Sequence, residues 1–110
     1  MPLFRMIRKA IEFDASLLLK DAAKSGGLAD AESLVEVIDA AVAKYDFVTE
    51  GEAGVSNINS QRAALALNLC SLATNHAKGE GAVNHISAAL ERHNSAIPDV
   101  KFIIIPAVAA

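Results

Sequence analysis

Residues 30–49 read DAESLVEVIDAAVAKYDFVT, and this stretch decides the fold class. Its apolar residues recur at three- and four-residue spacing, which is typical of one buried face of an α-helix. That face consists of Leu34, Val35, Ile38, Ala41, Val42 and Tyr45. Asp30 precedes the pattern and is a favourable N-cap, so we expect the helix to begin there and to run to about Thr49. The stretch therefore predicts an amphipathic helix that packs one side into a core.

Three further segments have helical patterns. The first covers about residues 2–24, with an expected apolar face of Leu3, Phe4, Ile7, Ile11, Ala15, Leu18 and Ala22. A segment from about residue 57 to Lys78 is apolar on nearly every side, which predicts a central or interface helix. A shorter helix is expected over 81–94, with His93 near its inward face. Because the glycine-containing connections are short, we predict an antiparallel four-helix bundle.

Residues 98–110 differ from the rest of the chain, since they are rich in β-branched residues, with Pro98 and Pro106 on either side of the run 99–105. The protein is therefore predicted to be mainly all-α, with a bundle domain over 1–97 and an extended, strand-like segment over 98–110. The centre of this segment is expected to pair across a dimer, within the chain or with another protein: Phe102, Ile103, Ile104 and Ile105. If residues 46–49 fray into a strand and pair with it, the fold becomes α+β.

Composition limits the class of protein. The chain has 110 residues, 53% of them hydrophobic but only 5% aromatic, and a net charge of −3. We find no apolar run of about 20 residues and no signal-peptide pattern, and the single cysteine excludes an internal disulfide. These features predict a cytoplasmic protein that does not enter membranes. Residues 26–52 hold seven carboxylates against Lys44 alone, and this acidic block argues against nucleic-acid binding.

The acidic residues of the segment 30–49 lie on the side opposite its apolar face. Glu32, Glu36, Asp39 and Asp46 recur there at helical spacing, with only Lys44 expected nearby to offset them. We predict that these four carboxylates dock a basic protein partner. The alternative is a solvated face that only maintains solubility.

Three amides follow one another at heptad spacing on the third predicted helix: Gln61, Asn68 and Asn75. Exposed helix faces are usually charged, so uncharged amides beside leucines suggest a partly covered surface. We interpret them as a helix–helix or partner interface, with a role in homodimer formation. The alternative is an ordinary boundary face of the bundle.

Candidate chemistry is sparse. Asp14 falls within the expected apolar face of the first helix, and His76 and His93 could approach each other if the last two helices are antiparallel. These three residues form a possible ligand pocket between helices. The histidine spacing does not match helical metal sites, and the chain has no P-loop, His-Glu-x-x-His or nucleophile-elbow motif. We therefore expect a non-enzymatic interaction protein without cofactor or metal; the alternative is a small-molecule or metal-binding domain, including an enzyme, with this pocket as its site.

Overall fold

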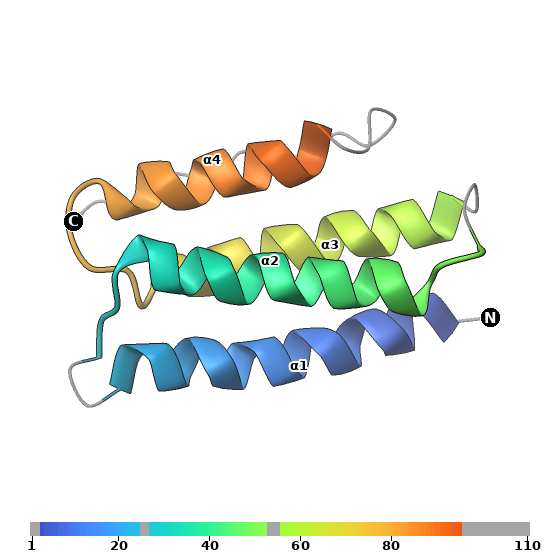
Figure 1. The fold of residues 1–110 in the computed structure, drawn as a ribbon, viewed down its shortest axis with the longest axis horizontal. Coiled ribbons are helices and arrows are strands. Elements are labelled where there is room, and N and C mark those ends of the chain that lie inside the picture. Colours follow the sequence, from blue (N-terminus) through green and yellow to red (C-terminus); the bar gives the residue numbers. More distant parts are fainter. Residues whose placement is uncertain (1–2, 25–26, 53–55, 96–110) are drawn as a thin grey trace.

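The predicted four-helix bundle is confirmed. The computed structural model describes residues 3–24, 27–52 and 56–95, and Figure 1 shows successive helices running in opposite directions. In chain order they are α1 (Leu3–Ala23), α2 (Ala31–Val48), α3 (Ser56–Thr74) and α4 (Ala82–Ser95). The helices α2 and α3 contact each other and both outer helices, whereas α1 and α4 do not meet. The segment 98–110, predicted to be strand-like, and with it the boundary at residue 97, lies outside the described residues.

Both ends of α2 are where the sequence predicts them. The Asp30 carboxylate accepts hydrogen bonds from the backbone amide and the hydroxyl of Ser33, at 3.1 and 2.9 Å. These bonds satisfy an N-terminal donor of the helix and lower the pKa of Asp30. At the other end the Thr49 hydroxyl donates to the carbonyl of Tyr45 at 2.8 Å. Residues 46–48 are helical, so the alternative in which 46–49 frays into a strand is wrong.

The core lies between the four helices, and each of them contributes fully or almost fully buried side chains: Leu19, Leu34, Ile38, Tyr45, Leu65, Leu69 and Ile86. Tyr45 is completely buried, and its hydroxyl donates to the carbonyl oxygen of Ile58 at 2.8 Å. This bond connects the end of α2 to the first turn of α3, because a buried phenol needs a hydrogen-bond partner.

The buried face of α1 differs from the predicted one. Leu3 and Leu18, both expected on the buried face, are 49% and 53% exposed, whereas Leu19 is fully buried. The residues that form the core side are spaced four apart, namely Ile11, Ala15, Leu19 and Ala23. Leucines at 17, 18 and 19 make the periodicity compatible with more than one buried face. Because α1 packs against both α2 and α3, Leu19 is the one that is buried. With this shift, Asp14 lies in an exposed position instead of the apolar face.

The third helix ends earlier than predicted, at Thr74 instead of Lys78. The residues that follow it pair with the connection between α1 and α2 through an isolated parallel bridge between Ala29 and Ala77. Ala29 donates to the His76 carbonyl at 2.7 Å, and Lys78 donates to the Ala29 carbonyl at 2.8 Å. Two connections at one end of the bundle thereby satisfy each other's backbone groups, which helical continuation of α3 would prevent.

Candidate functional site

The four acidic residues predicted to dock a partner divide into two groups. Glu32 and Glu36 are exposed on the first two turns of α2. Asp39 and Asp46, further along the helix, form ion pairs with residues of α4 and α3. The expectation that only Lys44 offsets this charge is thus wrong, because arginines from distant parts of the sequence reach the same side of α2.

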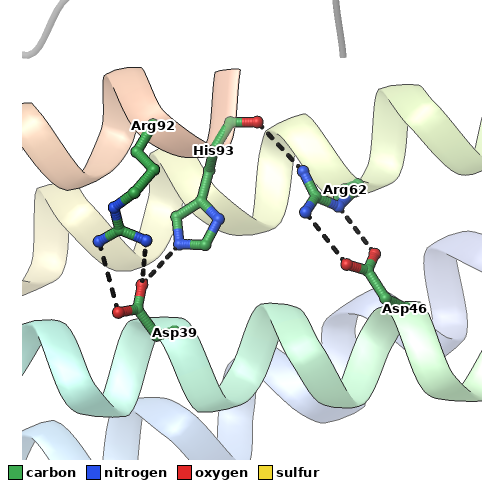
Figure 2. A network of polar contacts seen from close by, with 5 residues as sticks. All are labelled: Asp39, Asp46, Arg62, Arg92 and His93. Atoms are coloured by element: carbon green, nitrogen blue, oxygen red, sulfur yellow. Dashed lines mark hydrogen bonds and ion pairs between the residues drawn. The ribbon is translucent and has the colours of Figure 1, made fainter. Parts of the chain in front are cut away.

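Asp46 forms a two-bond ion pair with Arg62 (Figure 2). The Nε and Nη2 atoms of Arg62 donate to the two carboxylate oxygens at 2.7 and 3.0 Å, while its Nη1 atom donates to the backbone carbonyl of His93 at 3.1 Å. The arginine side chain is only 14% exposed. A planar guanidinium fits such a divided set of acceptors, so Arg62 joins α2, α3 and α4.

Asp39 holds the other end of this polar cluster. Its carboxylate accepts from Arg92 at 3.1 and 3.4 Å, and one of its oxygens lies 2.7 Å from Nε2 of His93. His93 is buried, as its predicted inward position requires. Among the described residues its ring bonds to no hydroxyl, thiol or second histidine. The arrangement therefore anchors α4 on α2 and lacks the nucleophile of a catalytic triad.

The structure places Asp14, His76 and His93 in three different surroundings. Asp14 is exposed on α1, beside α2, and the backbone of His76 belongs to the bridge at the end of α3. His93 contacts Asp39, in the third turn of α2, whereas the backbone of His76 contacts Ala29, which precedes α2. Within the described ranges no three histidine, cysteine or carboxylate side chains lie together in a way that would hold a metal ion.

A small groove does lie beside Asp14. It runs between α1 and α2, is floored by apolar side chains such as Ala15, Val37 and Ala41, and also meets Lys44. Its volume is about 130 Å³, whereas sites for small molecules usually measure about 300–1,000 Å³. The groove is therefore smaller than a typical small-molecule site.

The amide residues of α3 are engaged within the chain. The Gln61 side-chain oxygen accepts from Nε of Arg8 at 2.9 Å, and Asn68 donates to Glu12 at 3.0 Å. Arg8 and Glu12 are themselves paired at 3.1 Å along α1. Gln61 and Asn68 thus set the register between α1 and α3. This contact is the helix–helix interface that is one of the two interpretations of the amides. Asn75 is exposed just after α3, and Phe102 to Ile105 lie outside the described residues.

Cys70 offers no reactive thiol. It is completely buried in α3, and burial raises its pKa to about 12. The attacking species in cysteine chemistry is the thiolate, which is absent at neutral pH when the pKa is so high. Cys70 is a core residue.

The surface feature that sequence reasoning missed is a second apolar face on α1. We call it the outer stripe; its residues are Leu3, Met6, Ala10, Phe13 and Leu17. All five are exposed, Phe13 to 63% and Met6 to 60%. Their spacing alternates three and four, the a/d pattern of a coiled coil, and it was the signal that could have revealed them. A hollow of about 310 Å³ adjoins Phe13 between α1 and Leu72 of α3.

The described helices do not include one that is long and apolar enough to cross a bilayer. Comparison of the chain with protein-family models, with curated proteins and with solved structures finds no match.

Proposed function

We propose that this chain is a non-enzymatic protein–protein interaction module and that the outer stripe is its main docking surface. The observation that carries the proposal is the exposure of Phe13, Met6 and Leu3 on the side of α1 opposite its core residues. Large side chains exposed together on one helix face mark an interaction surface more often than single exposed leucines do. Aromatic residues and methionine are also enriched in the centres of protein interfaces.

The acidic face supports a second, smaller contact. Asp39 and Asp46 neutralise arginines of the same chain, which leaves Glu32 and Glu36 as the two predicted docking residues outside the ion pairs of the described residues. A basic partner would meet these two on the first two turns of α2, and Glu32, in the first turn, also interacts favourably with the helix dipole. The alternative of a ligand pocket receives less support, because its three residues are dispersed and the groove at Asp14 is small.

A site-specific photocrosslinking experiment tests the proposal. A photoreactive amino acid is placed at Leu17 in the outer stripe, at Glu36 on the acidic face, or at Glu91 as an exposed control on α4. Illumination of cells that produce the full chain should give discrete protein adducts from position 17, and from position 36 if the acidic face docks a partner. The proposal is refuted if positions 17 and 36 give no more adduct than position 91.

A further inference from the structure

We infer that the outer stripe binds the same stripe of a second copy of this chain, with the two α1 helices parallel. The inference rests on the proposed function, since it names the occupant of that docking surface. Its first support is the spacing: Leu3, Ala10 and Leu17 fall seven residues apart, with Met6 and Phe13 between them. Two helices with this repeat interlock with each other along a common seam.

The charges beside the stripe select the orientation. Lys9 lies on the flank next to α3, where it adjoins the hollow near Leu72. Asp14 lies on the opposite flank, next to α2. In a heptad with Leu3 at position a, Lys9 is a g residue and Asp14 is an e residue. In a parallel pair, each g residue lies beside the e residue of the partner helix that is five positions further along the sequence. Lys9 therefore meets Asp14 of the second copy, twice in a symmetric dimer.

An antiparallel pair would bring like flanks together, lysine to lysine and aspartate to aspartate. The flanking charges are available for contacts between copies, since the ion pairs of the described residues include neither Lys9 nor Asp14. Arg8 and Glu12, by contrast, are already paired inside the chain. The charge pattern thus complements a second copy in one orientation and opposes it in the other.

The position of α1 in the bundle permits this contact. Figure 1 shows α1 at one side of the bundle, and it contacts α2 and α3 but not α4. Two bundles can therefore pair through their α1 helices without rearranging the core, because the outer stripe points away from Ile11, Ala15 and Leu19. The dimer would have α1 and its copy at the centre.

The test uses the purified full chain, with light scattering and sedimentation over a wide concentration range. We expect a monomer–dimer equilibrium. Phe13→Glu should weaken it by at least about tenfold, because the exposed ring leaves the interface once in each copy. Lys9→Glu should weaken it about twofold to fivefold, and addition of Asp14→Lys in the same chain should restore it. Thermal unfolding of dilute protein checks that each exposed-site variant folds.

Disulfide formation reports the orientation. Under mild oxidation Leu17→Cys should form a disulfide between copies, because parallel helices place the two residues at position 17 opposite each other. In an antiparallel pair centred on Ala10 they would be about 21 Å apart along the axis. Glu91→Cys on α4 is the matched control and should not form the disulfide.

Three results would overturn the inference: a monomer at every concentration, a dimer that Phe13→Glu leaves intact, or a monomer that binds phosphatidylcholine–phosphatidylserine vesicles through the stripe. The second result would assign dimerisation to another surface, such as the segment 98–110. If the purified chain is monomeric but position 17 crosslinks to another protein in cells, this inference fails while the proposed function stands.

Discussion

Replacement of Tyr45 by phenylalanine removes one hydroxyl from the core and leaves the ring in place. The hydroxyl donates to the carbonyl oxygen of Ile58 at 2.8 Å inside the fully buried contact of α2 with α3. The Ile58 carbonyl also accepts the helical hydrogen bond from the backbone amide four residues later in α3, so it keeps a hydrogen-bond partner in the variant. The expected cost is one net hydrogen bond, about 0.5–1.5 kcal/mol of unfolding free energy at neutral pH.

The same hydroxyl makes stability depend on alkaline pH. Burial, with a smaller contribution from the Asp46 carboxylate, raises the pKa of Tyr45 from 10.0 to about 12. Because the folded state favours the neutral phenol, the stability that Tyr45 contributes is complete below pH 10. It is lost as the pH rises to about 12, since the unfolded chain releases the phenol proton first. The total loss is roughly 3 kcal/mol, of which about half has occurred by pH 11. Cys70 titrates over a similar range, so the measurement uses a Cys70→Ala background.

The assay is direct because Tyr45 is the only tyrosine and the chain has no tryptophan. Tyrosinate absorbance then follows one group, with an expected midpoint near pH 12 in the native protein and near pH 10 in denaturant. Urea unfolding compares the background protein with Tyr45→Phe at several pH values. The variant should be less stable at pH 8 and at least as stable near pH 11. A native midpoint near 10, or a stability difference independent of pH, would refute the reasoning.

Three further predictions concern burial and ion pairs. Native Cys70 should react with an aromatic disulfide reagent at least about a thousandfold more slowly than the denatured chain, as followed by absorbance, and fast native labelling would contradict its burial. Arg92→Ala should cost less than about 0.5 kcal/mol in urea titrations, since its side chain is 55% exposed. His93→Ala should lower the free energy of unfolding by about 1–3 kcal/mol. Equal losses in the Arg92 and His93 variants would argue against the described ion-pair cluster. Leu69→Ala should cost about 2–5 kcal/mol in dilute protein, whereas Leu17→Ala should leave monomer stability within about 0.5 kcal/mol; thermal unfolding separates the two.

The fold was predictable because its local signals agree with one another. In α2 the cap at Asp30, the apolar face up to Tyr45 and the acidic opposite side all indicate the same helix, and the structure has it there. Short connections then require antiparallel neighbours. The error in α1 arose where local signals do not decide: Leu17, Leu18 and Leu19 are consecutive, and only packing against two neighbouring helices determines which of them is buried.

The candidate site was less predictable because its contacts join distant residues. Asp39 meets Arg92, which lies 53 positions away in the sequence, and Arg8 meets Gln61 over the same separation. The spacing of charges along one helix cannot show which of them another helix will neutralise. The early end of α3 has the same cause, since the bridge between Ala29 and Ala77 forms between two connections.

The outer stripe is a part of the sequence that the monomer does not explain. The core of α1 is supplied by residues such as Ile11 and Leu19, so polar residues in place of Phe13 and Met6 would leave that core unchanged. Apolar side chains in water contribute stability only when something removes them from it. The stripe residues repeat every seven positions, with opposite charges on its two flanks, and this pattern suits contact with a second α1 helix. An apolar patch that arose by chance would require neither the spacing nor the charges. Association of the chain and its function are therefore best sought on the same helix face.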